Sequence, residues 1–163
     1  TEQASAIVDN TAKVGITTEQ ASAIVDNTAK VGYTQPIYEV NTFYEELGGY
    51  VIQISTNGKH GLVVAKQDQG SSTWYLANDL LSDPSKHDIH GKKFLDWRLP
   101  TKRELDLMYD VYSDGNAVDL TSGNYWSSTE HGYNTAWKQN FANGYQFSHF
   151  KYNADLVRAV RAF

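Results

Sequence analysis

Apolar and small residues at the start of the chain recur at alternating spacings of three and four within a repeated segment. Residues 1–15 recur identically as residues 18–32. The recurring seam positions are Ala4, Ile7, Thr11, Val14, Thr18, Ala21, Val25 and Thr28. This spacing is typical of a coiled-coil seam, and the Ala, Glu, Gln and Lys content favours helix. Pro36 disfavours helix in the residue before it, so residues 1–35 are predicted to form a helical stem.

A second register of the same repeat places an Asn between an Ile and a Val in each copy. A polar residue in a seam fixes register and oligomeric state at some cost in stability. The pattern resembles segments of trimeric fibres and trimeric adhesin stalks, which implies a parallel homotrimer. The predicted oligomer contacts are Ile7, Asn10, Val14, Ile24, Asn27 and Val31. The alternative is a frayed leader, because an isolated helix of this length is marginally stable.

Residues 36–163 alternate short apolar runs with turn residues, which predicts one α+β domain. The runs Tyr50–Ile54 and Gly61–Ala65 flank an Asn57-Gly58 turn and predict a β-hairpin. Leu76, Leu80 and Leu81 have helical spacing, and Pro84 follows them.

Two signals further along the chain predict a second helix and a last strand. Thr101 and Glu104 form a capping box that predicts a helix start. The segment Leu156–Phe163 alternates with period two and predicts one half-buried strand.

Three ordered motifs resemble a known family. They lie at residues 96–105 (DWRLPTKREL), 125–130 (YWSSTE) and 157–163 (VRAVRAF). Their order and spacing resemble the C-terminal domain of Legionella collagen-like proteins, a family with a C-type-lectin-like fold, over residues 48–163. The resemblance implies a mixed twisted sheet, two helices and a final strand beside the first. We also expect Arg158 or Arg161 to pair with an acidic group or a carbonyl.

Composition and charge exclude several classes of function. The net charge is −5, which argues against nucleic-acid binding, and cysteine is absent, which excludes disulfides, a Cys nucleophile and thiolate metal ligands. No apolar run approaches the ~20 residues of a membrane span, so no membrane insertion is expected. His87 and His90 lack an evident third ligand, so no metal site or other cofactor is predicted. Neither the Glu-Pro-Asn nor the Gln-Pro-Asp calcium motif of sugar-binding C-type lectins is present.

The sequence also lacks the features expected of an enzyme. Formylglycine-generating oxidases share the broad fold, but their copper chemistry needs cysteines. The hydroxyls of residues 127–129 lie near His131 without a glycine elbow or an orienting acid. We therefore expect no catalytic residues, and we expect these hydroxyls to satisfy backbone groups at a strand end.

Residues 129–157 interleave large aromatic rings with Asn, Ser and Gly. Such rings give rigid contact area, and short polar side chains supply adaptable hydrogen bonds, as in antibody paratopes. Trp126, Trp137 and Phe141 are predicted to be core residues. The run Phe147–Phe150 has no periodicity and is predicted to be a loop with exposed rings. Several exposed rings together usually mark an interface.

The same segment resembles the variable region of proteins diversified by retroelements, in which adenines of Asn codons are rewritten. Changing only adenines in an Asn codon gives Tyr, Phe, His, Ser, Asp, Ala or Gly, but never Lys, Gln, Trp or Glu. Gln139, Gln146, Lys151 and Trp137 would therefore be scaffold. The predicted ligand-binding residues are Tyr133, Asn134, Ala142, Tyr145, Phe147, Ser148, His149, Phe150, Tyr152 and Asp155.

These patterns together predict a non-catalytic binding protein at a virion or cell surface. The expected partner is a protein or surface receptor, bound by a trimer of stem-bearing heads with added avidity. Two alternatives stay open. A fixed adhesin that binds glycans would keep residues 145–155 identical between sister genes. A structural fibre segment would use the rings as subunit contacts.

Overall fold

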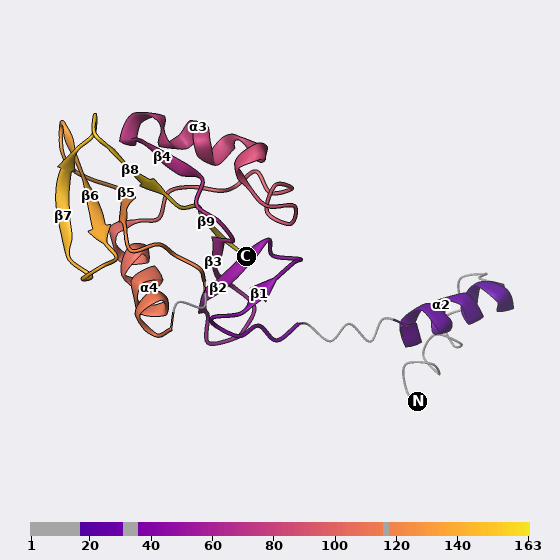
Figure 1. The fold of residues 1–163 in the computed structure, drawn as a ribbon. Helices are drawn as coiled ribbons and strands as arrows, with labels where there is room; N and C mark the ends of the chain where they lie inside the picture. Colours follow the sequence, from indigo (N-terminus) through magenta and orange to yellow (C-terminus); the bar gives the residue numbers. More distant parts are fainter. Residues whose placement is uncertain (1–16, 31–35, 116–117) are drawn as a thin grey trace. The chain divides into compact units, whose positions relative to one another are not determined.

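Figure 1 shows the computed structural model, which describes residues 17–30, 36–115 and 118–163. The chain divides into two units, Thr1–Pro36 and Ile37–Phe163. We call the second unit the head. No helix within the described ranges combines the length and apolar character needed to cross a membrane.

The described part of the first unit contains one helix, α2 (Thr18–Lys30). The Thr17 side chain accepts a hydrogen bond from the Gln20 N–H, and the Gln20 side chain accepts one from the Thr17 N–H, so the helix start is capped. Helix formation in the second repeat copy is thus confirmed. Ile24 is 41% exposed in the single chain. The predicted contacts Ile7, Asn10, Val14 and Val31, and the side chain of Asn27, lie outside the described residues.

The head contains two sheets, and the first has four antiparallel strands. Its order is β1 (Phe43–Tyr44), β2 (Gly49–Ile54), β3 (Gly61–Ala65) and β9 (Val160–Ala162). β2 and β3 form the predicted hairpin, and the Gly58 N–H bonds to the Ser55 carbonyl in the turn.

The second sheet has five strands and is mixed. Its order is β4 (Gly70–Thr73), β8 (Ala154–Val157), β5 (Asn124–Gly132), β6 (Thr135–Asn140) and β7 (Gln146–Phe150). β5 and β8 pair in parallel, whereas the other pairs are antiparallel. β7 lies at the edge of the sheet, as Figure 1 shows.

Two α-helices accompany the sheets of the head, as predicted. The first is α3 (Ala77–Ser82), between the 3₁₀ turns η1 (Trp74–Leu76) and η2 (Pro84–Lys86). The second is α4 (Lys102–Ser113), which begins at the predicted capping box. The mixed α+β class is therefore confirmed.

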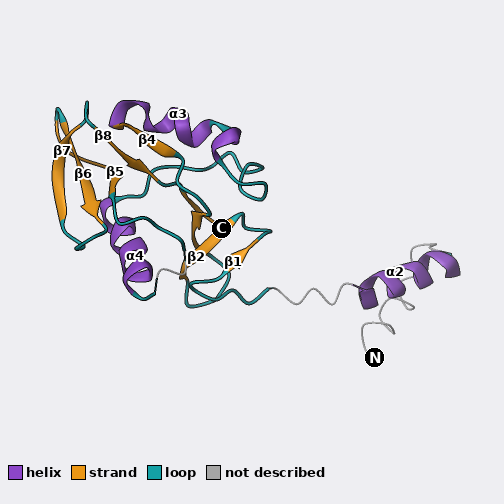
Figure 2. Ribbon diagram, in the orientation of Figure 1, coloured by secondary structure: helices purple, strands orange, loops and turns teal. Residues whose placement is uncertain are grey.

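Neighbouring residues on one strand point into two different cores. Val63 and Trp126 pack in the cluster that includes α3, whereas Val64 and Tyr125 pack in the cluster that includes α4. Because successive side chains of a strand alternate between faces, the sheets separate the two helices. Figure 2 shows α3 and α4 on opposite sides of the head.

The end of the chain differs from its prediction. Residues 156–163 do not form one strand: β8 and β9 belong to different sheets, and β9 lies beside β3, not beside the first predicted strand. The break is at Arg158, whose buried guanidinium donates to the carbonyls of Ala65, Lys66 and Val118. These bonds anchor the crossing between the two sheets.

Arg158 and Arg161 both pair with acidic groups, which confirms the expectation of at least one such pair. Arg158 Nη1 lies 2.9 Å from Asp68 Oδ1, and Arg161 Nε lies 2.8 Å from Asp96 Oδ1. The Tyr125 hydroxyl also donates to Asp68. Burial, together with the Asp68 charge, raises the pKa of Tyr125 to about 12.

Candidate functional site

The predicted loop at residues 147–150 is a strand with exposed rings. β7 pairs with β6 over five residue pairs, from Thr135–Phe150 to Gln139–Gln146. The expectation of a loop was wrong: β7 is a strand, but both of its faces are partly reached by water, so its sequence shows no hydrophobic alternation. The expectation of exposed rings holds. The exposed fractions of these rings are Tyr133 93%, Tyr145 73%, Phe147 40%, Phe150 48% and Tyr152 64%.

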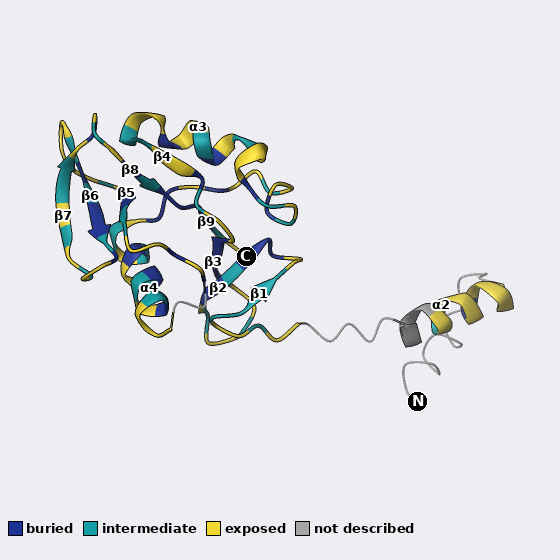
Figure 3. Ribbon diagram, viewed as in Figure 1, coloured by how far each residue is buried: buried dark blue, intermediate teal, exposed yellow. Residues whose placement is uncertain are grey.

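We call these five residues the aromatic surface; it borders both faces of the sheet, because Phe147 and Phe150 are three residues apart on β7 and lie on opposite faces. Figure 3 shows that the strand bearing two of them, β7, is more exposed than the neighbouring β6. The rings of Phe150 and Tyr152 stack with centroids 5.2 Å apart and an interplanar angle of 13°. Of the polar or small predicted residues, Asn134 and Ala142 are exposed, and Ser148 is half-buried.

Tight turns at the end of β6 hold the part of the aromatic surface that contains Tyr145. The Asn140 and Asn143 side chains accept the N–H groups of Ala142 and Tyr145. Gly144 adopts φ +78°, and a Cβ there would lie 2.6 Å from the Tyr109 ring. Only glycine fits this turn without strain, so the start of β7 is fixed against α4.

Two glutamines tie the same hairpin to the helix beneath it. The amide of buried Gln139 donates to the Asp106 side chain and to the Gly144 carbonyl. Gln146 Nε2 donates to the Lys102 carbonyl at the start of α4 and to the Gln139 amide oxygen. Both glutamines therefore stabilise the position of the β6–β7 hairpin on α4. We call such buried or hydrogen-bonded supporting residues the frame.

Lys151 joins the other end of β7 to the β5–β6 turn. Its side chain is buried, and its ammonium bonds to the Glu130 carboxylate and to the Tyr133 carbonyl. Its N–H donates to the Asn134 carbonyl, and its Nζ lies 4.5 Å from the Trp74 ring centroid. The backbone beneath Tyr133 and Tyr152 is thus held by one buried cation.

Asp155 and His149 were predicted to be surface contacts. The structure buries Asp155 in a charge cluster, whereas the side chain of His149, which contacts the same cluster, is 29% exposed. Asp155 is 8% exposed, and its carboxylate lies 2.9 Å from the buried Lys138 ammonium and 2.7 Å from His149 Nδ1. Asn153 Nδ2 lies 3.0 Å from His149 Nε2. A hydrogen on Nδ1 lets the ring donate to Asp155 and accept from Asn153. We call Lys138, His149 and Asp155 the charge cluster.

Trp137 also differs from its prediction as a buried core residue. It is half-buried, and Lys102 Nζ lies 3.4 Å from its ring centroid while the His131 ring packs edge-on. Trp126 and Phe141 are completely buried, as predicted. The difference arises because α4 covers the Phe141 end of this face with apolar side chains and the Trp137 end with a lysine.

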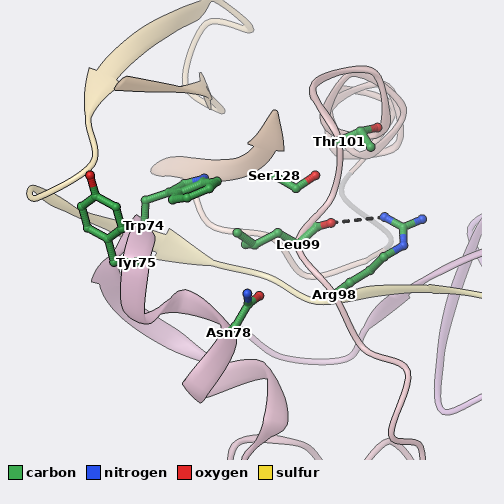
Figure 4. A pocket seen from close by; sticks show the side chains of 7 residues that line it. All are labelled: Trp74, Tyr75, Asn78, Arg98, Leu99, Thr101 and Ser128. Carbon is green, nitrogen blue, oxygen red and sulfur yellow. Dashed lines mark hydrogen bonds between the residues drawn. The ribbon is translucent and has the colours of Figure 1, made fainter. Parts of the chain in front are cut away.

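A pocket of ≈ 420 Å³ lies beside the β5 strand, as Figure 4 shows. It is lined by Trp74, Tyr75, Asn78, Arg98, Leu99, Thr101 and Ser128. We call it the Trp74 pocket. Sequence reasoning missed it, because its residues come from η1, α3, the start of α4 and β5. The adjacent aromatic pair Trp74-Tyr75 was the one local signal.

One ion pair at the Trp74 pocket is bidentate. Arg98 Nη1 and Nη2 each lie 2.7 Å from an oxygen of the Glu104 carboxylate. Partial burial opposes ionisation of Glu104, but the hydrogen bonds from Arg98 and the Thr101 N–H are stronger in sum and lower its pKa. The hydrogen bond to Glu104 raises the pKa of Arg98. Both groups are charged at neutral pH and cancel each other.

Comparison with known families decides the identity of the head. Residues 53–161 match the Lcl C-terminal domain. The chain belongs to the Lcl C-terminal domain family. The family predicted from three motifs is therefore confirmed, and the match includes every residue of the aromatic surface. A comparison with curated proteins finds no significant match.

The Lcl C-terminal domain is not a known catalytic family. In this domain the hydroxyls of residues 127–129 are hydrogen-bonded to backbone groups. Ser127 Oγ donates to the Trp137 carbonyl, and Thr129 Oγ1 accepts a hydrogen bond from the Lys102 N–H. Within the described residues, no three His, Cys, Asp or Glu side chains gather as metal ligands would.

Proposed function

We propose that this Lcl C-terminal domain is a non-catalytic receptor-binding head of C-type-lectin-like type. The observation that supports this most strongly is the aromatic surface: five rings exposed to water, on strands and turns held in place by buried Gln139 and Lys151. Exposed rings of this kind supply contact area at low entropic cost, and they cluster at interfaces. The expected partner is a protein or surface receptor, with Ser148 and Asn134 as adaptable polar contacts.

We also propose that a retroelement diversifies this surface. The five exposed rings are all reachable from an Asn codon by adenine changes. Gln139 and Lys151 are not reachable, and both are buried frame residues. Asp155 and His149 are reachable although they lie in the charge cluster, so variation there would require changes that keep the cluster satisfied. That the exposed rings are reachable while buried Gln139 and Lys151 are not supports the proposal, and Asp155, which is reachable but buried, is the exception.

The proposed assembly is a homotrimer at a virion or cell surface. The Asn-containing repeat and the helical second copy support a trimeric stem. Three heads on one stem would bind with higher avidity than a single head, without any new contact.

The decisive experiment for diversification is sequencing of sister genes and of the DNA beside the gene. The proposal predicts an Asn-rich near-copy, a reverse transcriptase gene, and variation at Tyr145, Phe147 and Tyr152 with constancy at Gln146 and Lys151. Identical residues 145–155 in all sister genes would overturn it and favour a fixed adhesin.

A further inference from the structure

The Trp74 pocket is linked through Lys151 to the backbone that carries Tyr133 and Tyr152. The backbone N–H of Trp74 donates to the Lys151 carbonyl, and Lys151 directly precedes Tyr152. Lys151 Nζ lies 4.5 Å from the Trp74 ring centroid and 5.9 Å from that of Tyr75. The same ammonium bonds to the Tyr133 carbonyl. One buried lysine therefore contacts the pocket wall and the turn that carries an exposed ring.

Trp74 is the anchored part of the pocket wall. Trp74 Nε1 donates to the Ser127 carbonyl at 2.7 Å, and the ring is half-buried. Tyr75 is 57% exposed, and Leu99 is buried. Figure 4 shows Trp74 and Leu99 side by side, with Asn78 below them and Arg98 on the far side. A preorganised apolar wall favours binding because little side-chain entropy is lost.

The pocket carries no net charge. Arg98 is its only charged lining residue, and the bidentate pair with Glu104 neutralises it. A phosphate, sulfate or carboxylate ligand would therefore gain little binding energy there, because it would compete with the Glu104 carboxylate for Arg98.

Few polar groups in the pocket are free. The Asn78 amide and the Tyr75 hydroxyl make no hydrogen bond within the described residues, whereas Thr101 Oγ1 accepts the Glu104 N–H and Ser128 Oγ donates to the Pro100 carbonyl. A sugar ring would bury several hydroxyls against these few partners, and each unpaired hydroxyl is costly. A ring without hydroxyls, or with one, matches the wall better.

From these observations we infer that the Trp74 pocket binds an aromatic side chain of the protein partner, as a constant anchor beside the variable surface. A volume of ≈ 420 Å³ lies in the range of small-ligand sites and is large enough for one ring. Buried aromatic anchors dominate the energy of many interfaces. This inference rests on the proposed binding function and adds the part of the receptor that the head would recognise.

The test is an NMR titration of the full chain with N-acetyl-phenylalanine amide, compared with methyl β-galactoside. The readouts are the indole N–H signal of Trp74, assigned by its loss in Trp74→Phe, and the side-chain amide signals of Asn78. The inference predicts saturable shifts of these signals, with half-saturation at a probe concentration of about 1 mM for a ligand of this size. The galactoside should leave them unchanged.

Two variants sharpen the test. Tyr75→Ala removes an exposed part of the wall and should weaken probe binding at least about fivefold. Asn78→Trp fills the pocket and should abolish the shifts. Ile89→Ala, which changes a residue 70% exposed outside the pocket, is the matched control and should bind as the native chain does. Retained amide spectra exclude unfolding as the cause.

The outcomes separate this inference from the proposed function. No shift, or binding unaffected by Tyr75→Ala and Asn78→Trp, overturns the anchor pocket. Galactoside binding without phenylalanine binding overturns it in favour of a glycan site. If sister genes vary at the aromatic surface while the probe does not bind, only the pocket inference fails. If the probe binds while sister genes are identical, only the proposed diversification fails.

Discussion

Single residues in the 129–157 segment have opposite roles that their types do not reveal. Tyr133 and Tyr152 are exposed, whereas Lys138 and Lys151 are buried beside them. Buried ammonium groups are stable only when paired, and both lysines here have carboxylate partners. The burial of Lys151 agrees with the scaffold role predicted for it from the genetic code. The same argument placed Asp155 on the surface, because neither codons nor composition show that its carboxylate faces the buried Lys138.

The charge cluster is expected to be essential for stability. Lys138→Met leaves the Asp155 carboxylate buried without its cation, so the free energy of unfolding should fall by about 3–5 kcal/mol in urea titrations. Lys92→Met, at an exposed lysine, is the control and should change it by less than about 0.5 kcal/mol. A loss below about 1 kcal/mol in Lys138→Met would contradict the paired, buried state of this cluster.

Glu104 should contribute to stability in a pH-dependent way. The pKa of Glu104 is lower in the folded chain than its ordinary value, so its contribution to stability is present above that ordinary value and is lost as pH falls through the folded pKa. Melting temperatures measured from pH 7 to pH 2 should therefore fall less steeply in the acid range for Glu104→Gln than for the native chain. Parallel curves would show that the Arg98 pair is not formed in solution.

At the scale of elements, apolar runs predicted β2 and β3, whereas the edge strand β7 was missed. β2 and β3 follow their apolar runs and the Asn57-Gly58 turn. β7 has no such alternation, since both of its faces are partly reached by water. The alternation of residues 156–163 continues through Arg158, so the sequence did not show that β8 and β9 belong to different sheets. The Trp74 pocket was equally hidden, because tertiary contacts assemble it from distant segments.

The capping box of α4 was the clearest local signal, and its energetic contribution can be measured. Thr101 Oγ1 accepts the Glu104 N–H, and the Glu104 carboxylate accepts the Thr101 N–H at 2.7 Å. Thr101→Ala should lower the free energy of unfolding by about 1 kcal/mol. Thr101→Ser keeps the hydroxyl and should retain most of it. Equal stability of the two variants would show that the cap contributes nothing.

At the scale of the whole molecule, the proposed arrangement is a trimeric stem that bears heads with a fixed frame and a changeable surface. The predicted homotrimer has a simple test in sedimentation equilibrium. The full chain should sediment at about three times its mass of 18.3 kDa, and Ile24→Asp, which puts a charge in the predicted seam, should shift it toward the monomer. A monomer at every concentration would contradict the trimeric stem while leaving the head unaffected.

The most direct test of the central claim is the thermal unfolding of a chain in which Tyr145, Phe147, Phe150 and Tyr152 are all replaced by Ser. The account predicts a cooperative transition within about 5 °C of the native chain, because these rings are exposed. Phe141→Ala, at a completely buried ring, should by contrast cost about 3–5 kcal/mol. If the fourfold variant melts as low as Phe141→Ala, or without cooperativity, the rings belong to the core and the head has no changeable surface.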